Sequence, residues 1–432
     1  MTAQSRPLSL AAATLVNLNI MIGSGIFINT VILAHTAGAY GAVTYAAVGL
    51  LILPLMLSFS ELARQHSGGS FYSYVAPLSK TWGFMSLWNY SISKLASCAV
   101  ALHVSMSLLQ TIFPTLTTIP LIMLDLCTLL LFTILNSFHV QFGKQVQLFF
   151  MIGKLAPILF VIAIGCITAC GSLPYTQELE FHTLSDGIRG VPFVLYAFMG
   201  FEMVCGLTRA LKDPERTIPR AMIIAYAICI SLTTLFQWFF FCLVPYLGTL
   251  SSYLAAFPAL VHVLHIPNQH LAIICMHTGI ALSAAGASFG IMYANAGNFY
   301  ELARRKLLIF SSFFAHRNSL HTPVRCIIAE SVVVALFLIF SQGNIQVLQK
   351  LSATGVTLTY LLGALTLLIA TPHITRTTRF IAFLGSCSAL VLFTICLSSL
   401  TTAGIAPPIC FITIAALGVI MKWYYKEADT PL

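Results

Sequence analysis

The sequence predicts an all-α integral membrane protein with 12 transmembrane helices. Three observations predict this class. Hydrophobic residues make up 58% of the 432 residues and charged residues only 8%, whereas about a quarter of the residues in a soluble domain are charged. Apolar runs of about 20 residues, which is the length needed to cross a bilayer, recur along the chain. The basic residues gather in alternate loops between those runs, as they do in membrane proteins of defined orientation.

Each apolar run is expected to form one membrane-spanning helix, and the third, fifth and eighth are long enough to tilt. A seven-residue polar start precedes the first run, which is too long for a cleaved signal peptide. A short outer helix is expected in the long connection 247–269. The predicted spans are 9–34, 40–62, 83–112, 119–138, 146–170, 187–208, 220–246, 270–300, 324–341, 346–370, 379–400 and 404–423.

The loop charges predict the orientation of these spans. The loops 35–39, 113–118, 171–186, 247–269, 342–345 and 401–403 contain no lysine or arginine, whereas every loop on the opposite side contains at least one. Cytoplasmic loops carry the excess of basic residues. Both termini are therefore expected in the cytoplasm. The low charge of the outer loops favours a bacterial inner membrane. The net charge of +9 is explained by orientation, so nucleic-acid binding is not expected.

Two of the spans contain helix-breaking residues. The first holds Gly23, Ser24 and Gly25, and the sixth holds Pro192 followed by Gly200. Glycine is costly inside a helix and lets the backbone unwind. The two broken spans are five spans apart, so the second would be inverted relative to the first. We therefore expect inverted repeats over 1–171 and 172–371, with two additional helices and a cytoplasmic tail over 372–432.

A break in a membrane helix exposes backbone groups that bind ligands. The N–H groups at the start of the second half of span one, around Gly23–Gly25, carry a partial positive charge that suits a carboxylate. The alternative is close helix packing, since small residues also let membrane helices approach one another. Two broken spans in inverted repeats favour a binding site near the middle of the bilayer.

Four ordered motifs in the first half of the chain are similar to those of a known family. They are residues 21–27 (MIGSGIF), 61–63 with 67–72 (ELA and SGGSFY), 198–202 (FMGFE) and 212–221 (KDPERTIPRA). Together they resemble the amino acid–polyamine–organocation transporter superfamily, and especially its bacterial amino acid permeases and antiporters. After span seven the likeness is weaker. Where the family often has an arginine late in span eight, this chain reads ANAGN at 294–298.

The resemblance implies a leucine-transporter-like fold of five-plus-five inverted repeats with broken helices one and six. It implies secondary active transport of an amino acid by alternating access. The substrate carboxylate would meet the backbone at Ile22, Gly23, Ser24 and Gly25. The amino group would meet carbonyls at the second break, and an aromatic ring of span six would close over the substrate. These second-break residues are Ala197, Phe198 and Gly200, with Tyr196 as the aromatic ring.

Among the charged residues within the predicted spans we single out three, because an ionisable side chain inside the membrane is a functional candidate by default. Lys154 lies about 15 Å into span five. It resembles the lysine that replaces sodium in proton-coupled members of the family, although snorkelling toward the cytoplasm is the alternative. Glu202 follows the second break and is either a proton carrier or a hydrogen-bonded structural carboxyl. Lys154 and Glu202 are the candidates for proton coupling.

Lys94 lies with Tyr90 on the polar face of span three, which is expected to point into the helix bundle. In antiporters of the family, this stretch contributes to the pocket for the substrate side chain. A cation there would favour acidic or polar amino acids and repel cationic ones. The alternative is a structural lysine paired with a carboxylate. A carrier of cationic amino acids or polyamines therefore remains an alternative function.

Other classes of protein fit the sequence less well. A filter loop typical of channels is not found, and no catalytic motif or metal-ligand spacing is recognised. We therefore expect a carrier and not an enzyme, with a small amino acid and membrane lipid as partners and no cofactor or metal. Protons are a candidate coupling ion. A transporter-like amino acid sensor remains an alternative. The oligomeric state is open, and a homodimer is compatible with the sequence.

Overall fold

The computed structural model describes residues 9–66, 70–138, 144–170, 184–202, 213–320, 322–372 and 374–424. Over these residues the chain forms α-helices and short 3₁₀ helices, with no strand. The α-helices are α1 (Leu10–Met21), α2 (Gly25–Ala37), α3 (Tyr40–Gln65), α4 (Phe71–Val75), α5 (Lys80–Ile112), α6 (Leu121–Ser137), α7 (Lys144–Cys170), α8 (Leu184–Phe198), α9 (Pro214–Leu243), α10 (Ala256–Val263), α11 (Gln269–Arg304), α12 (Ser311–Phe314), α13 (Val324–Ser341), α14 (Ile345–Ile369), α15 (Arg376–Thr401) and α16 (Ala406–Tyr424).

The described helices are long and apolar enough for a multi-pass membrane protein. Seven of them, α3, α5, α9, α11, α13, α14 and α15, meet the requirement individually, and α1 with α2 meets it as a bent pair. Shorter apolar helices occupy α6, α16 and part of α7, at the predicted fourth, twelfth and fifth spans. The number of twelve spans and the five-plus-five repeat stay predictions. Residues 203–208, expected to complete the sixth span, lie outside the described part of the chain.

The first span is broken where the sequence predicted. Helix α1 ends at Met21, α2 begins at Gly25, and the two axes differ by 45°. Helix α8 ends at Phe198, just before Gly200, whose φ of +122° is readily adopted only by glycine. Gly200 therefore allows the backbone to leave helical geometry after α8. The short helix expected within 247–269 is also confirmed, as α10, and its place on the outer side stays a prediction.

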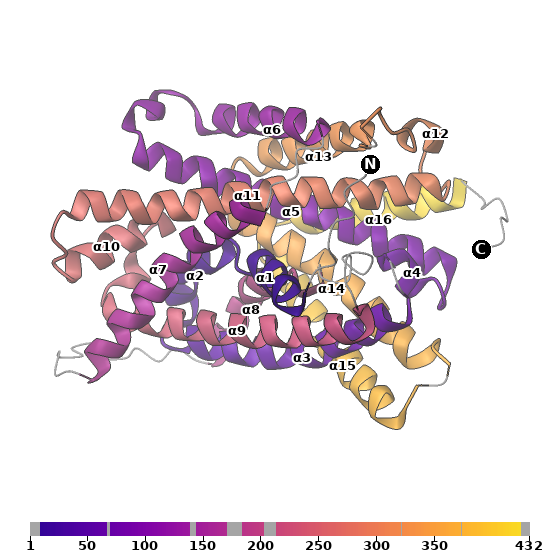
Figure 1. Cartoon of the computed structure of the whole chain (residues 1–432), viewed down its shortest axis with the longest axis horizontal. Helices are drawn as coiled ribbons and strands as arrows, with labels where there is room; N and C mark the ends of the chain where they lie inside the picture. Colours follow the sequence, from indigo (N-terminus) through magenta and orange to yellow (C-terminus); the bar gives the residue numbers. More distant parts are fainter. Residues whose placement is uncertain are drawn as a thin grey trace.

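The two broken helices lie in the middle of the bundle, as Figure 1 shows, with α5 and α11 on one side and α3 and α9 on the other. Helix α2 packs against α8, α3 against α9, α5 against α11, and α6 against α13. Each contact joins a predicted span to the one five positions later. Repeats related by a two-fold axis would place such helices side by side.

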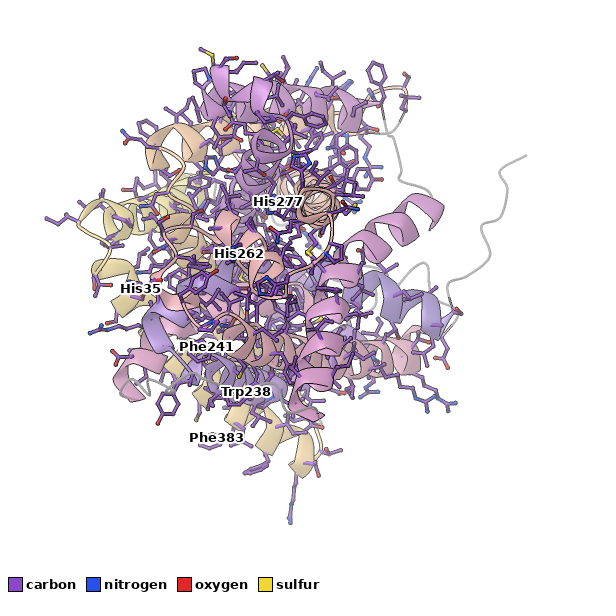
Figure 2. All side chains as sticks on the ribbon, turned by 90° about the vertical axis from the view of Figure 1, so that its left-hand side faces the viewer. His35, Trp238, Phe241, His262, His277 and Phe383 are labelled. Atoms are coloured by element: carbon purple, nitrogen blue, oxygen red, sulfur yellow. The ribbon has the colours of Figure 1, made fainter. Side chains whose placement is uncertain are left out.

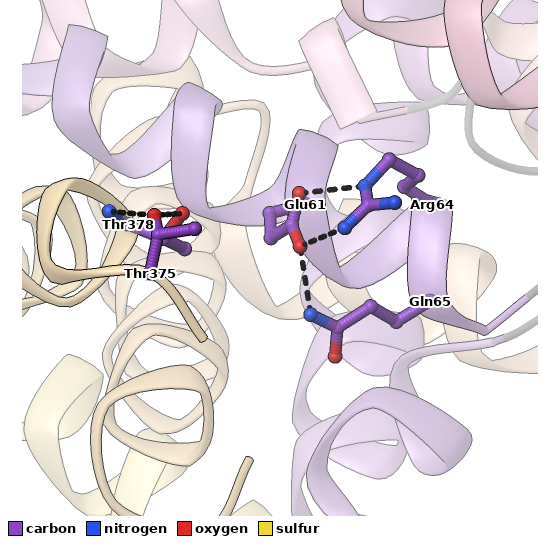
Figure 3. Close-up of polar contacts among 5 residues, drawn as sticks. All are labelled: Glu61, Arg64, Gln65, Thr375 and Thr378. Atoms are coloured by element: carbon purple, nitrogen blue, oxygen red, sulfur yellow. Dashed lines mark hydrogen bonds and ion pairs between the residues drawn. The ribbon is translucent and has the colours of Figure 1, made fainter. Parts of the chain in front are cut away.

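The two ends of the bundle differ in their polar residues. Figure 2 views one end, where His35 of α2, His262 of α10 and His277 of α11 are seen. It is the predicted outer end. Figure 3 shows a cluster at the other end, where Arg64 and Gln65 both donate to Glu61 at 2.7 Å. Glu61 and Arg64 form an ion pair near the surface, and such a pair contributes little to stability.

Candidate functional site

A cavity of about 580 Å³ lies where the broken helices meet. This volume is typical of small-molecule sites. Helices α1, α2 and α8 supply the end of its wall that contains the breaks, and α4, α5, α7 and α11 supply the rest. The lining residues include Asn19, Gly23, Ser24, Gly25, Tyr74, Tyr90, Lys94, Ser97, Ala101, Lys154, Tyr196, Ala197, Glu202, Gly286, Ala287, Gly290 and Asn295.

The first break presents backbone donors to this cavity. No backbone acceptor is found among the described residues for the N–H groups of Ser24, Gly25 and Ile26. These groups begin α2, where the helix dipole adds a partial positive charge. Ser24 and Gly25 line the cavity. The break therefore offers a carboxylate two or three N–H donors and a favourable field.

Glu202 lies at the centre of a buried polar cluster on the cavity wall. Its Oε1 accepts a hydrogen bond from the Tyr90 hydroxyl at 2.8 Å and lies 3.0 Å from the Lys94 Nζ. Its Oε2 accepts from the Tyr360 hydroxyl at 2.8 Å and from the Gly200 N–H at 2.9 Å. Both side chains of the ion pair are nearly inaccessible to solvent. Four donors on two oxygens suit an ionised carboxylate.

Lys94 is therefore paired, which is the alternative that the sequence left open. Its Nζ also lies 5.2 Å from the centre of the Tyr90 ring. Since Glu202 neutralises it, Lys94 adds little net charge to the cavity. The pairing removes the physical argument for acidic substrates, although Lys94 does line the cavity as expected.

Lys154 connects α7 to the end of α1. Its Nζ donates to the Asn19 carbonyl at 2.7 Å, and the side chain is almost fully buried. Carbonyls in the last turn of a helix lack helical partners and carry partial negative charge. The lysine therefore satisfies one of them just before the break. The side chain points into the bundle and does not snorkel toward the cytoplasm.

The cavity is closed toward the predicted outer end. The Asn29 amide of α2 donates to the Phe193 carbonyl of α8 at 2.6 Å. Gln349 of α14 donates to the Asn29 Oδ1 at 3.1 Å. Asn29 and Gln349 are fully buried. Toward the predicted cytoplasmic end the cavity continues past Asn19 and Asn298. The structure thus has its outer side closed and its cavity extended inward.

The sequence analysis singled out none of the individual residues that α11 contributes to the wall. Gly286, Ala287, Gly290 and Ala294 all line the cavity. A Cβ built on Gly290 would meet nothing within 4 Å, so this side of the cavity is open. The signal was present in the sequence, because small residues recur every three or four positions and so share one helix face. Tyr360 was also missed, since nothing near it in sequence marks it.

Three predicted site residues lie behind the cavity wall. Ile22 and Phe198 are fully buried, and Phe198 packs edge-on against Tyr45 at 5.7 Å. Gly200 packs against Ile20 and donates its N–H to Glu202. Their roles in substrate binding stay predictions. The other nine line the cavity: Gly23, Ser24, Gly25, Tyr90, Lys94, Lys154, Tyr196, Ala197 and Glu202.

An apolar helical bundle with a central cavity at two helix breaks defines a multi-pass membrane protein with an internal small-molecule site. The family model for amino acid permeases matches residues 8–421. The chain therefore belongs to the amino acid permease family, within the superfamily that the four motifs indicated.

The chain is similar to several curated permeases. It is 24% identical over 221 residues to the gamma-aminobutyric acid permease of Bacillus subtilis, covering 48% of this chain and 46% of the relative. It is 29% identical over 223 residues to the histidine permease of Lactococcus lactis, with the same two shares. It is 29% identical over 241 residues to the large neutral amino acids transporter small subunit 2 of Oryctolagus cuniculus, covering 52% and 44%. The aligned part of the chain spans about half the length of these relatives.

Proposed function

We propose that this protein is a secondary transporter that moves an amino acid across the membrane by alternating access. The observation that carries the proposal is the cavity of about 580 Å³ at the two helix breaks. The cavity lies between the N–H groups at the start of α2, which have no backbone acceptor among the described residues, and the carbonyl end of α8. These two ends have opposite partial charges. They match the carboxylate and the ammonium group that every α-amino acid carries.

In this proposal the substrate carboxylate binds the N–H groups of Ser24 and Gly25. The ammonium group binds the last carbonyls of α8, near Ala197. Tyr196 covers the substrate, in keeping with its position on the cavity wall. The substrate side chain extends toward α11, where Gly290 leaves room. Binding through backbone groups makes recognition of the amino acid moiety independent of the substrate side chain.

The transport cycle alternates this inward-extended state with an outward-open one. Opening the outer side requires that α2 separate from α8 and α14, which breaks the two hydrogen bonds of Asn29. Either a proton or a second amino acid resets the carrier, and a substrate can only shift the equilibrium by its differential affinity. We also propose cytoplasmic termini in a bacterial inner membrane, on the alternation of loop charges.

The charges of the cavity favour a neutral amino acid. Glu202 is the one carboxylate among the described lining residues, and it already forms an ion pair with Lys94. A cationic side chain would therefore find no unpaired acid. An acidic side chain would compete with Glu202 for Lys94 and leave two buried carboxylates to share one cation, which is costly. The other lining cation, Lys154, already donates to the Asn19 carbonyl. Electroneutral substrates avoid both costs.

We expect purified protein in liposomes to exchange neutral amino acids faster than glutamate, arginine or putrescine. The measurement is counterflow of radiolabelled compounds, with leucine, serine, histidine and gamma-aminobutyrate in the panel. Gly290→Leu should lower the exchange of large substrates more than that of small ones, because the new side chain extends into open space of the cavity. Gly297→Leu is the matched control, since Gly297 is in the same helix, also has open space and does not line the cavity.

The alternatives give different outcomes. Preferential exchange of glutamate would support the prediction that Lys94 selects acidic substrates. Preferential exchange of arginine or putrescine would favour a carrier of cationic substrates. Binding of an amino acid without any exchange would indicate a sensor. If the Gly290 and Gly297 substitutions had equal effects, α11 would not form the part of the cavity that contacts the substrate side chain.

Lys154→Met should strongly reduce transport while the protein still folds. The variant keeps the apolar stem but removes the bond to the Asn19 carbonyl, and a hydrogen bond from a charged group typically contributes about 1.5–3 kcal/mol. Its loss frees the end of α1, so substrate exchange should slow. Lys80→Met, at the exposed start of α5, is the control. Unchanged counterflow in Lys154→Met would mean that this lysine has only a packing role.

A further inference from the structure

A second buried acid lies outside the cavity wall and has surroundings unlike those of Glu202. Glu330, in the second turn of α13, has no exposed surface. Neither of its carboxyl oxygens accepts a hydrogen bond of ordinary length from any residue that the structure describes, and a longer interaction with the Asn295 side chain remains. An ionised carboxylate without a partner is far more costly to bury than a protonated one. The Glu330 carboxyl therefore carries a proton in this conformation.

The neighbours of Glu330 are polar but uncharged. They come from three helices: Cys98 of α5, Asn295 of α11 and Cys326 of α13. Each has its own partner. The Cys98 thiol bonds to Ser288, the Asn295 amide donates to the Ser91 carbonyl at 3.1 Å, and the Cys326 thiol donates to the Phe314 carbonyl at 3.3 Å.

The ionisable groups on the other helices packed against α13 are also bound elsewhere. Asp125 of α6 bonds to the His103 ring of α5 at 2.7 Å. Lys350 of α14 donates to the Ser399 carbonyl, and Tyr360 of α14 donates to Glu202. Helix α12 has no ionisable side chain. The cations of α5 and α13 are bound elsewhere as well, Lys94 to Glu202 and Arg325 to the Phe313 carbonyl. None of these groups pairs with Glu330.

Asn295 connects this carboxyl to the substrate cavity. The Asn295 side chain lines the cavity and also neighbours Glu330. Its Oδ1 accepts a hydrogen bond from Asn298, another lining residue, at 3.0 Å. Glu330 is thus separated from the cavity by one layer of polar side chains. A change in the α11 wall would expose the carboxyl to water in the cavity.

We propose that Glu330 is a proton-binding site of the transport cycle. The carboxyl holds its proton while α5, α11 and α13 are packed as observed. When Asn295 moves with α11, the O–H bond breaks, the proton passes to water in the cavity, and a carboxylate remains. Glu202, with four donors, stays ionised throughout. Two buried acids in opposite surroundings therefore divide the roles of structural anion and proton carrier. This inference rests on the proposed transport function.

The test uses the full-length protein in liposomes with a substrate identified by counterflow. Counterflow needs no net proton movement, whereas accumulation driven by a pH gradient does. We expect Glu330→Gln to retain counterflow and to lose both gradient-driven accumulation and substrate-induced acidification, read with a trapped pH dye. Glu330→Asp, which keeps a carboxyl, should recover part of both. Glu301→Gln, in the last turn of α11, where the carboxylate is half-buried and paired with Arg305, is the control and should behave like the wild type.

Each outcome is decisive. Gradient-driven accumulation that survives in Glu330→Gln would overturn the proposal. Loss of counterflow together with accumulation would assign Glu330 a structural role and would also overturn it. A wild-type protein that exchanges substrate but moves no protons would overturn the proton site and leave the transport function intact. Absence of counterflow for every compound in the panel would instead contradict the transport function itself.

Discussion

Replacing Glu202 with alanine should destabilise the protein by about 3–5 kcal/mol and abolish transport, because removal of one partner leaves a buried charge uncompensated. The Lys94 Nζ lies 3.0 Å from Glu202 and is almost inaccessible to solvent. The substitution also leaves the hydroxyls of Tyr90 and Tyr360 without the acceptor they share. The measurement is thermal or denaturant unfolding in detergent, together with counterflow in liposomes.

A double-mutant cycle distinguishes the ion pair from general packing. Lys94→Met and Glu202→Gln should each destabilise the protein, and the double variant should be more stable than the sum of the two effects predicts, because it removes both charges and keeps the volume. Additive effects would show that the two side chains do not interact. If the double variant regains stability but not transport, the charges themselves take part in the cycle.

Gly279→Ala should have the largest effect of any small substitution in α11. A Cβ at this position would lie 2.5 Å from the carbonyl oxygen of Gly153 in α7. A backbone atom cannot move aside as a flexible side chain can, so α7 must be displaced. Overpacking of this kind typically costs about 1–3 kcal/mol. Lys154 directly follows Gly153, so displacement of α7 would also lengthen the bond to Asn19 and lower transport.

The matched control is Gly297→Ala in the same helix. A Cβ on Gly297 would meet nothing within 4 Å, and alanine is a better helix former than glycine by about 1 kcal/mol. The unfolding temperature of the Gly297→Ala variant should therefore equal or exceed that of the wild type. The close crossing of α7 and α11 would be contradicted if both variants had the same stability, or if Gly279→Ala transported at the wild-type rate.

Much of the fold could be predicted because membrane insertion is governed by local composition. A run of apolar residues crosses the bilayer wherever it occurs in the chain. The first helix is interrupted at Gly23–Gly25, as predicted from the low helix propensity of glycine, which is also a local property. The outer helix α10 was predicted from its own apolar content. The four motifs led to the permease family, which the match over residues 8–421 confirms.

The site was predicted less completely because its chemistry depends on pairs of residues that are distant in the sequence. Tyr90 and Tyr360 bond to Glu202 from 112 and 158 residues away. Nothing near Lys94 in the sequence marks Glu202 as its partner. The interpretation of Lys94 as a selectivity residue for acidic substrates thus rested on a charge that the fold neutralises.

The sequence by itself determined that this chain is a multi-pass membrane protein of the permease family, with a helix break near Gly23–Gly25. These properties follow from the composition and backbone freedom of short segments. Only the tertiary structure decided which buried carboxyl group has hydrogen-bond donors around it and which does not. Glu202 meets four donors and Glu330 meets none among the described residues. Two glutamates within predicted membrane spans look alike in sequence, and only the residues packed against them determine whether each carboxyl is ionised.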